Sequence, residues 1–308
     1  MKKLFIMLAA AATVASCAKE STVMEAPGQA IEFGNVFVDN ATRADYSSTD
    51  ITAFKVYGTV NDKNILNGDN VTKGNTPYGE AWALTDAESG QTLNHYWIEG
   101  ASYKFAAVVD ANKVNVDTTT GMPTSLEYSA AGQKDMLYKY VTKTGAAKGS
   151  NSIVSFTFSH LLAKAHFTVT NGTPDSKYTY TITNVQVTNA YQKGEYTVNG
   201  DNGSWSGSDA DETTFAPIES VAYGTPKSNA DLLLIPGANI GVSFTVNLYI
   251  GNEFITSYNY TKDNVATLVA NTVYNFNVAL QPNDLIEFTV NKKPEWNTPT
   301  NDVNVTLQ

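Results

Sequence analysis

Three histidines and a single cysteine are the side chains of this 308-residue chain best suited to bind a transition metal, and the cysteine would be its strongest nucleophile. His160 and His166 would lie about 20 Å apart on one extended strand, which is too far to share an ion. His95 stands in the aromatic stretch Asn94-His95-Tyr96-Trp97. One cysteine excludes disulfide frameworks, thiolate zinc sites and iron–sulfur clusters. We therefore expect structural roles for all three histidines, and no metal or cofactor.

Motifs of enzymes are also missing. The sequence contains no Gly-x-Ser-x-Gly elbow, no His-Glu-x-x-His pair and no glycine-rich phosphate loop. Asp209-Ala210-Asp211-Glu212 could hold calcium, but it lacks the spacing and the glycine of an EF-hand loop, so a solvated acidic loop is favoured. The net charge of −10 leaves no basic stripe for phosphates. We expect neither an enzyme nor a nucleic-acid-binding protein.

The N-terminus has the features of a lipoprotein signal. Lys2 and Lys3 precede the apolar stretch Leu4–Val14, which is shorter than the roughly 20 residues that span a bilayer. Val14-Ala15-Ser16-Cys17 then resembles the bacterial lipobox, and the only cysteine stands where acylation requires it. Several acyl chains on Cys17, such as palmitate, would anchor the protein stably. The alternative is an ordinary secretory signal with a chance cysteine.

The remaining chain consists of short segments rich in Val, Ile, Phe, Tyr and Thr, separated by turn signals such as Asn67-Gly68. Strands are predicted over Ile51–Val60, Tyr103–Val109, Met136–Val141 and Val242–Ile250. No segment carries a sustained apolar repeat of 3.6 residues, the period of a helix. This pattern predicts an all-β protein made of sandwiches.

One segment predicts a bend, and a later one a domain boundary. The apolar positions of residues 153–169 change parity near His160 and Leu161, which a strand of period two can do only through a bulge or bend. Downstream, Asn171-Gly172-Thr173-Pro174 is the strongest turn signal in the middle of the chain. The predicted organisation is a signal peptide at 1–16, a lipidated propeptide at 17–43, and β-sandwich domains at 44–172 and 173–308.

Arg43 is the only arginine of the chain, which has 19 lysines. It follows the strand-like segment Ile31–Val38 and precedes the first predicted sandwich strand, so a cut between Arg43 and Ala44 would separate the two. Alternation puts three apolar side chains of that segment on one face, as a strand seated in a groove requires: Ile31, Phe33 and Phe37. The alternative is compositional drift that left one arginine by accident.

A series of motifs, in order along nearly the whole chain, resembles the fimbrillin family of the Bacteroidales, the lipoprotein pilins typified by fimbrillin A. The motifs are Tyr96-Trp97, Tyr103-Lys104-Phe105, Asp135-Met136-Leu137-Tyr138, Phe158-Ser159-His160-Leu161-Leu162-Ala163-Lys164, Leu233-Leu234-Ile235-Pro236, Asn271-Thr272-Val273-Tyr274-Asn275-Phe276, and Ile286-Glu287-Phe288-Thr289-Val290 leading to Trp296.

The resemblance implies two transthyretin-like β-sandwiches in tandem and a lipidated precursor at the outer membrane. It also implies cleavage by an arginine-specific protease and head-to-tail assembly with other fimbrial subunits into adhesive fibres. In such fibres the C-terminal strand of one subunit fills the groove vacated in the next. The end of this chain suits that role, because three apolar side chains alternate with polar ones: Val303, Val305 and Leu307. The alternative is that this tail is only the last strand of its own domain.

Two functions from different classes follow. The first is a structural subunit of a cell-surface fimbria, whose position as stalk, tip or accessory subunit stays open. The second is a monomeric surface lipoprotein that binds glycans or host proteins through exposed aromatic side chains: Trp82, Trp97, Trp205 and Trp296. Cleavage at Arg43 and a detachable strand favour the pilin, because a monomeric receptor needs neither.

Overall fold

The computed structural model describes residues 28–38, 51–76, 79–175, 177–281, 286–294 and 303–307. This part of the chain is almost entirely β-structure, with twenty strands and one 3₁₀ turn, η1 (Ala130–Gly132), so the all-β prediction is confirmed. No helix within these ranges has the length and apolar character to cross a bilayer. The expected acylation site Cys17 and the expected cleavage bond between Arg43 and Ala44 lie outside the described residues.

The strands form three sheets. The first has the order β1 (Phe33–Val38), β9 (Val154–His160), β8 (Leu137–Thr144), β5 (Ser102–Val109), β2 (Ala53–Val60), β3 (Lys63–Thr76) and β4 (Gly79–Thr85). The second has the order β14 (Lys227–Ser228), β10 (Ala163–Asn171), β18 (Thr272–Leu280), β19 (Ile286–Pro294) and β20 (Val303–Leu307), with β15 (Leu232–Leu234) also paired to β10. The third has the order β17 (Glu253–Thr267), β16 (Asn239–Ile250), β11 (Tyr178–Asn199), β7 (Pro123–Ser129) and β6 (Lys113–Val116), with β12 (Asn202–Thr214) and β13 (Ile218–Val221) also paired to β11.

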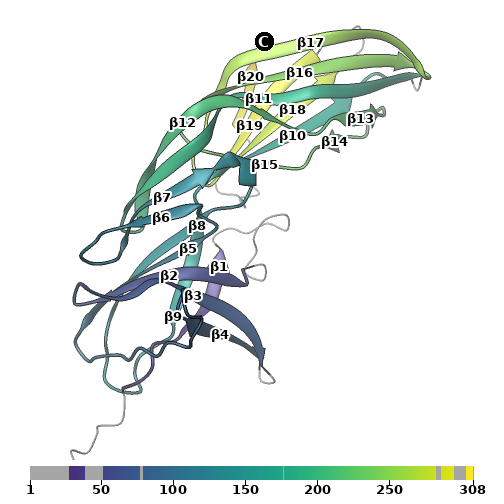
Figure 1. Cartoon of the computed structure of the whole chain (residues 1–308). Coiled ribbons are helices and arrows are strands. Elements are labelled where there is room, and N and C mark those ends of the chain that lie inside the picture. Colours follow the sequence, from purple (N-terminus) through teal and green to yellow (C-terminus); the bar gives the residue numbers. More distant parts are fainter. Residues whose placement is uncertain are drawn as a thin grey trace, which may run out of the picture.

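The first sheet makes up the lower half of the molecule in Figure 1. Its two end strands, β1 and β4, contact each other, so the sheet curls around its own apolar face. Aromatic rings fill that interior: Phe54 lies 5.5 Å from Phe156 and 5.6 Å from Phe158, measured between ring centroids. Trp97, from the loop after β4, closes the core against Tyr103 at 4.7 Å.

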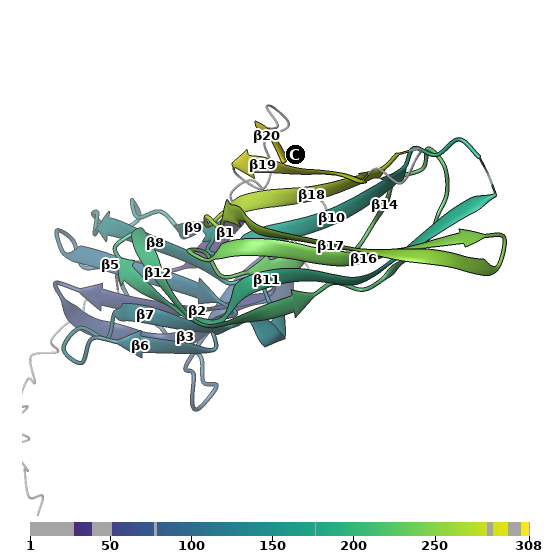
Figure 2. The same ribbon diagram turned by 90° about the horizontal axis from the view of Figure 1, so that it is seen from above.

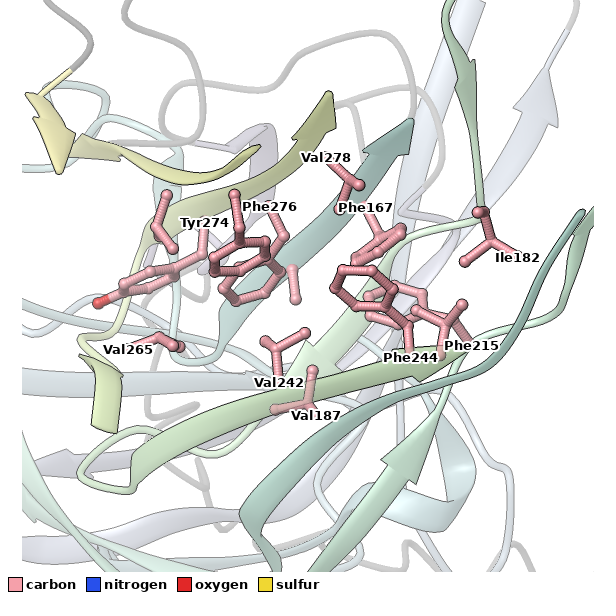
Figure 3. Packing of buried hydrophobic residues seen from close by; sticks show 14 of the residues in the cluster. Phe167, Ile182, Val187, Phe215, Val242, Phe244, Val265, Tyr274, Phe276 and Val278 are labelled. Carbon is pink, nitrogen blue, oxygen red and sulfur yellow. The ribbon is translucent and has the colours of Figure 1, made fainter. Parts of the chain in front are cut away.

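The second and third sheets pack face to face in the upper half. Figure 3 shows side chains of β10 and β18 meeting those of β16. Phe167 on β10 contacts Phe244 on β16 at 5.5 Å, and Phe276 stacks on Phe288 within the second sheet at 6.2 Å. All four rings are buried, and such buried aromatic pairs dominate the energetics of a core.

The long strand β11 links the two halves. Its first part pairs with β16 over 178–188, and its last part pairs with β7 over 193–197. A third apolar cluster lies at the junction between the two halves, which we call the waist. Here Tyr57 and Tyr138 on the outer face of the first sheet share a core with Tyr128 and Tyr196. The hydroxyl of Tyr138 also donates to the carbonyl of Gly200, 3.0 Å away.

The chain passes from the first sheet to the second at Leu161 and Leu162, between β9 and β10. The predicted change of parity marks this crossing: Phe156 and Phe158 lie in the core of the first sheet, and Ala165 in that of the upper half. The Asn171–Pro174 turn, after which the sequence predicts a domain boundary, follows the end of β10, about ten residues after this crossing.

Candidate functional site

The strand β1 lies at an edge of the first sheet, where it pairs in parallel with β9. Its register shifts between Gly34 and Phe37, and this irregularity reverses the face of the residues that follow. Ile31 and Phe33 are buried as predicted, but Phe37 is 51% exposed. The expectation that Phe37 shares their face is therefore wrong: Val36 and Val38 are buried in its place.

Backbone and side-chain contacts seat β1 in the core. The Phe33 ring meets Phe105 edge-on at 5.6 Å and stacks on Phe156 at 6.0 Å. Just before the strand, the Gln29 side chain donates to the Asn151 carbonyl at 2.8 Å and accepts from the Asn151 N–H at 3.1 Å. The Ile31 N–H donates to the carbonyl of His95 at 2.8 Å. The segment therefore contributes both an apolar face and a hydrogen-bonded edge.

The strand β20 lies at an edge of the second sheet, in the other half of the molecule from β1 (Figure 1). It pairs antiparallel with β19, from Lys292 opposite Val303 to Phe288 opposite Leu307. Seen from above, it is the outermost strand of its sheet, beyond β19 (Figure 2). In this structure the tail is thus the last strand of its own sheet, which is the alternative that the sequence left open.

The tryptophans of the described residues pack in cores. Trp97 is 7% exposed, and Trp82 packs on Phe54 at 5.4 Å. The indole N–H of Trp205 donates to the carbonyl of Leu161 at 2.7 Å, which fixes β12 to the crossing between the halves. Trp296 lies outside the described residues. These positions give no support to a binding surface of exposed tryptophans.

Two of the three histidines contact a carboxylate. His160 Nδ1 is 2.6 Å from Asp135 Oδ2, and both residues are buried at the waist. His166 Nδ1 is 2.6 Å from Asp231 Oδ1. His95 is half-buried, and burial lowers the pKa of its imidazole. Within the described ranges, no three His, Cys, Asp or Glu side chains gather as metal ligands.

The acidic run at 209–212 is not the loop that the sequence favours. It belongs to β12, which pairs with β11, and Asp209 has a backbone φ of 53°. The Asp209 carboxylate lies 2.8 Å from the Lys193 ammonium on the neighbouring strand. This geometry makes Asp209 a partner in a surface ion pair, which contributes little to stability because solvent screens it.

A pH dependence follows from Asp231, which lies 3.4 Å from the Lys164 ammonium as well as against His166. Burial acts to raise the pKa of this carboxyl, but the bond to His166 and the charge of Lys164 outweigh it and lower the pKa. A lowered folded-state pKa stabilises the protein above the unfolded value of about 3.9, and this stability is lost as the pH falls through the folded-state value. Asp231→Asn should therefore lose less stability than the wild type on acidification below about pH 4. Thermal melts in a pH series test this, and parallel curves for the two proteins would contradict it.

Comparison with known proteins gives the family. The model of a family described as fimbrillin-like matches residues 42–294. A solved structure of a candidate cell adhesion protein from Bacteroides uniformis superposes with a TM-score of 0.55 at 17% identity, covering 87% of this chain and 97% of that one. A second, from Bacteroides ovatus, gives a TM-score of 0.50 at 18% identity, covering 89% and 100%. At these identities the structures show a shared fold.

The fimbrial anchor protein Mfa2 from Porphyromonas gingivalis is also similar over 87% of this chain and 98% of its own, at 11% identity and a TM-score of 0.38. Among the curated proteins, none matches. The family match covers most of the chain, from the residue before Arg43 to the end of β19. The resemblance read from the ordered motifs is thereby confirmed, and the chain belongs to the fimbrillin-like family.

Proposed function

We propose that this protein is a structural subunit of a cell-surface fimbria, which is exported as a lipoprotein acylated at Cys17, cleaved after Arg43 and polymerised by strand exchange. Before cleavage it is held at the outer membrane, and afterwards it lies in an extracellular fibre that supports adhesion. Its partners are other copies of itself, related subunits and an arginine-specific protease. The observation that carries the proposal is β1: an edge strand, buried in a core, that a cut at Arg43 separates from the rest of the chain.

Loss of β1 would leave a groove ready for another strand. Phe105 and Phe156 form part of its floor, because both rings contact Phe33. Along one wall, β9 would have an unpaired edge over 154–158. Exposed apolar surface beside unpaired N–H and C=O groups is the usual acceptor for an added strand. Since β1 runs parallel to β9, a donor in the same register would also enter parallel to β9.

The C-terminal strand is the proposed donor. β20 has one neighbour, β19, in the sheet order, whereas a central strand would have to break two ladders to leave. It follows β19 across 295–302, a length of chain that lets the tail reach away from its own sheet at about 3.3 Å per residue. Because donor and groove lie in different halves, the contact is heterologous and propagates as an open filament.

Three forms of the protein test strand exchange: the intact precursor, the protein cut at Arg43, and the cut protein lacking residues 301–308. Only the second should form ladders that resist SDS, because it alone has both an open groove and a donor. An Arg43→Lys precursor treated with an arginine-specific protease is the matched control, since it keeps the charge and lacks the cleavage site. Ladders from the uncut form, or undiminished ladders from the truncated form, would refute the assignment.

A further inference from the structure

A cavity of about 710 Å³ opens on the third sheet, at the end where β16 turns into β17. Thr179 of β11 and Tyr249 of β16, which lie directly opposite each other in the pairing, line its floor. Both are half-buried and adjoin the buried residues Tyr180 and Leu248, so they point to the outer face of the sheet. This end of β16 and β17 points away from the lower half in both views (Figures 1 and 2).

Tyr249 on the outer face and the exposed Tyr223 line this cavity, whereas the ring of Tyr178, which also borders it, packs against the core on the other face of β11. Tyr223 is 54% exposed, although a large ring gains more from burial than from contact with water. The Tyr249 ring meets Phe254 nearly edge-on at 5.7 Å, a contact that orients it before any ligand arrives. The cavity thus presents rings that are partly held in place and only partly covered.

The remaining polar groups of the lining are neutral. Hydroxyls come from Thr179, Thr181 and Ser220, and an amide comes from Asn252, and among the described residues no charged side chain lines the cavity. A cavity of about 620 Å³ beside the first sheet differs in this respect, since Lys55, Asp110 and Lys113 all line it. The volume lies within the roughly 300–1,000 Å³ typical of ligand pockets.

Ser220, at the rim, has a backbone φ of 54°. A serine gains nothing intrinsic from this left-handed conformation, and residues held in such conformations cluster at binding sites. The pairing of β13 with β11 is irregular at this point, between Tyr180 and Ile182. The surrounding structure therefore keeps the rim in a conformation that its own sequence does not prefer.

We propose that this cavity binds a neutral carbohydrate. The C–H faces of a sugar ring carry partial positive charge and stack on the negative face of an aromatic ring, while its hydroxyls exchange hydrogen bonds with hydroxyl and amide side chains. Anionic sugars fit poorly, because the part of the chain that the structure describes places no basic group in the lining and the chain carries a net charge of −10. The site lies in the half that lacks β1 and does not depend on strand exchange.

The test uses lactose, N-acetyllactosamine and maltotriose as probes, with 3′-sialyllactose as the anionic counterpart of lactose. Saturation-transfer NMR and calorimetry on the full chain should detect saturable binding of at least one neutral probe. Tyr223→Ala should weaken that binding by about tenfold or more, as truncation of a central aromatic contact does. The control is Tyr96→Ala, which removes another exposed tyrosine, 40% accessible, in the lower half. Because Tyr223 is exposed, its truncation should leave the melting temperature unchanged, and this is measured in parallel.

Each outcome decides the proposal. Binding of a neutral probe that falls in Tyr223→Ala and persists in Tyr96→Ala supports it. Absence of saturable binding by all neutral probes overturns it, as does equal binding by both variants or preference for the sialylated probe. Self-association of the uncut protein that Tyr223→Ala abolishes would instead identify a contact between copies of this chain. A failure of strand exchange would leave the result of this experiment unchanged.

Discussion

Phe156→Ala is expected to lower the free energy of unfolding by about 3–5 kcal/mol, the usual cost of deleting a fully buried phenylalanine. Phe156 is 0% exposed and contacts three other rings, Phe33, Phe54 and Phe158, at centroid distances of 5.5–6.0 Å. The rings come from three strands of one curled sheet, so they cannot close together over the space that the deleted ring leaves. Urea titration followed by tryptophan fluorescence measures the change.

Phe254→Ala is the matched control for this prediction. Its ring is 54% exposed, so the same substitution should change the free energy of unfolding by no more than about 0.5 kcal/mol. A loss below about 1 kcal/mol in Phe156→Ala would show that the core of the first sheet relaxes around the cavity. Because Phe156 also contacts Phe33 of β1, the variant should weaken the seating of any strand in that groove.

Asp135→Ala is expected to cost about 1–3 kcal/mol, because it removes the carboxylate that forms a buried hydrogen bond with the His160 imidazole. The side chains of His160 and Asp135 are 0% and 6% exposed, and 2.6 Å separates the bonded atoms. Asp135 precedes β8 and His160 ends β9, next to the crossing between the halves. Loss of the Asp135 carboxylate should therefore destabilise the packing at the waist as well as the first sheet. The thermal unfolding transition of the variant should broaden.

Glu127→Ala provides the comparison, because it deletes a partner of an exposed pair of similar length. The Lys113 ammonium lies 2.7 Å from the Glu127 carboxylate, with side chains 61% and 43% exposed. Such solvent-screened surface pairs contribute little to stability, so this variant should unfold near the wild type. Equal destabilisation by Asp135→Ala and Glu127→Ala would refute the view that burial makes the first pair important. An Asp135→Asn variant, which keeps a hydrogen-bonding group, should recover part of the loss.

The amino-acid sequence determined the kind of element in each of the four segments predicted as strands, which correspond to β2, β5, β8 and β16. The segment predicted over Tyr103–Val109 is β5, Ser102–Val109, and the segment predicted over Val242–Ile250 is β16, Asn239–Ile250. The change of parity near His160 likewise marked the end of β9. These features are local: β-branched and aromatic residues, a period of two and turn-forming pairs act over a few positions.

The tertiary structure decided which strands pair with each other and which side chains are buried. Every strand offers the same backbone N–H and C=O groups. The sequence of β11 therefore does not indicate that its first part pairs with β16 and its last part with β7. The outward turn of Phe37 depends on the irregular register of β1 against β9, more than 100 residues away. For the same reason Trp82, Trp97 and Trp205, which one of the two hypotheses assigned to a binding surface, lie in cores that distant strands complete.

Some features of the candidate sites follow from the sequence alone, and others only from the tertiary structure. Sequence spacing alone identified Arg43 as the single arginine and Val303–Leu307 as an alternating tail, because both are properties of consecutive residues. The tyrosine-lined cavity draws on residues from 178 to 252, and its neutral lining exists only once β11, β13 and β16 are adjacent. His166 and Asp231 are likewise 65 positions apart until β15 pairs with β10. Short-range preferences fix which segments are strands, whereas burial of apolar faces between distant segments fixes which strands meet.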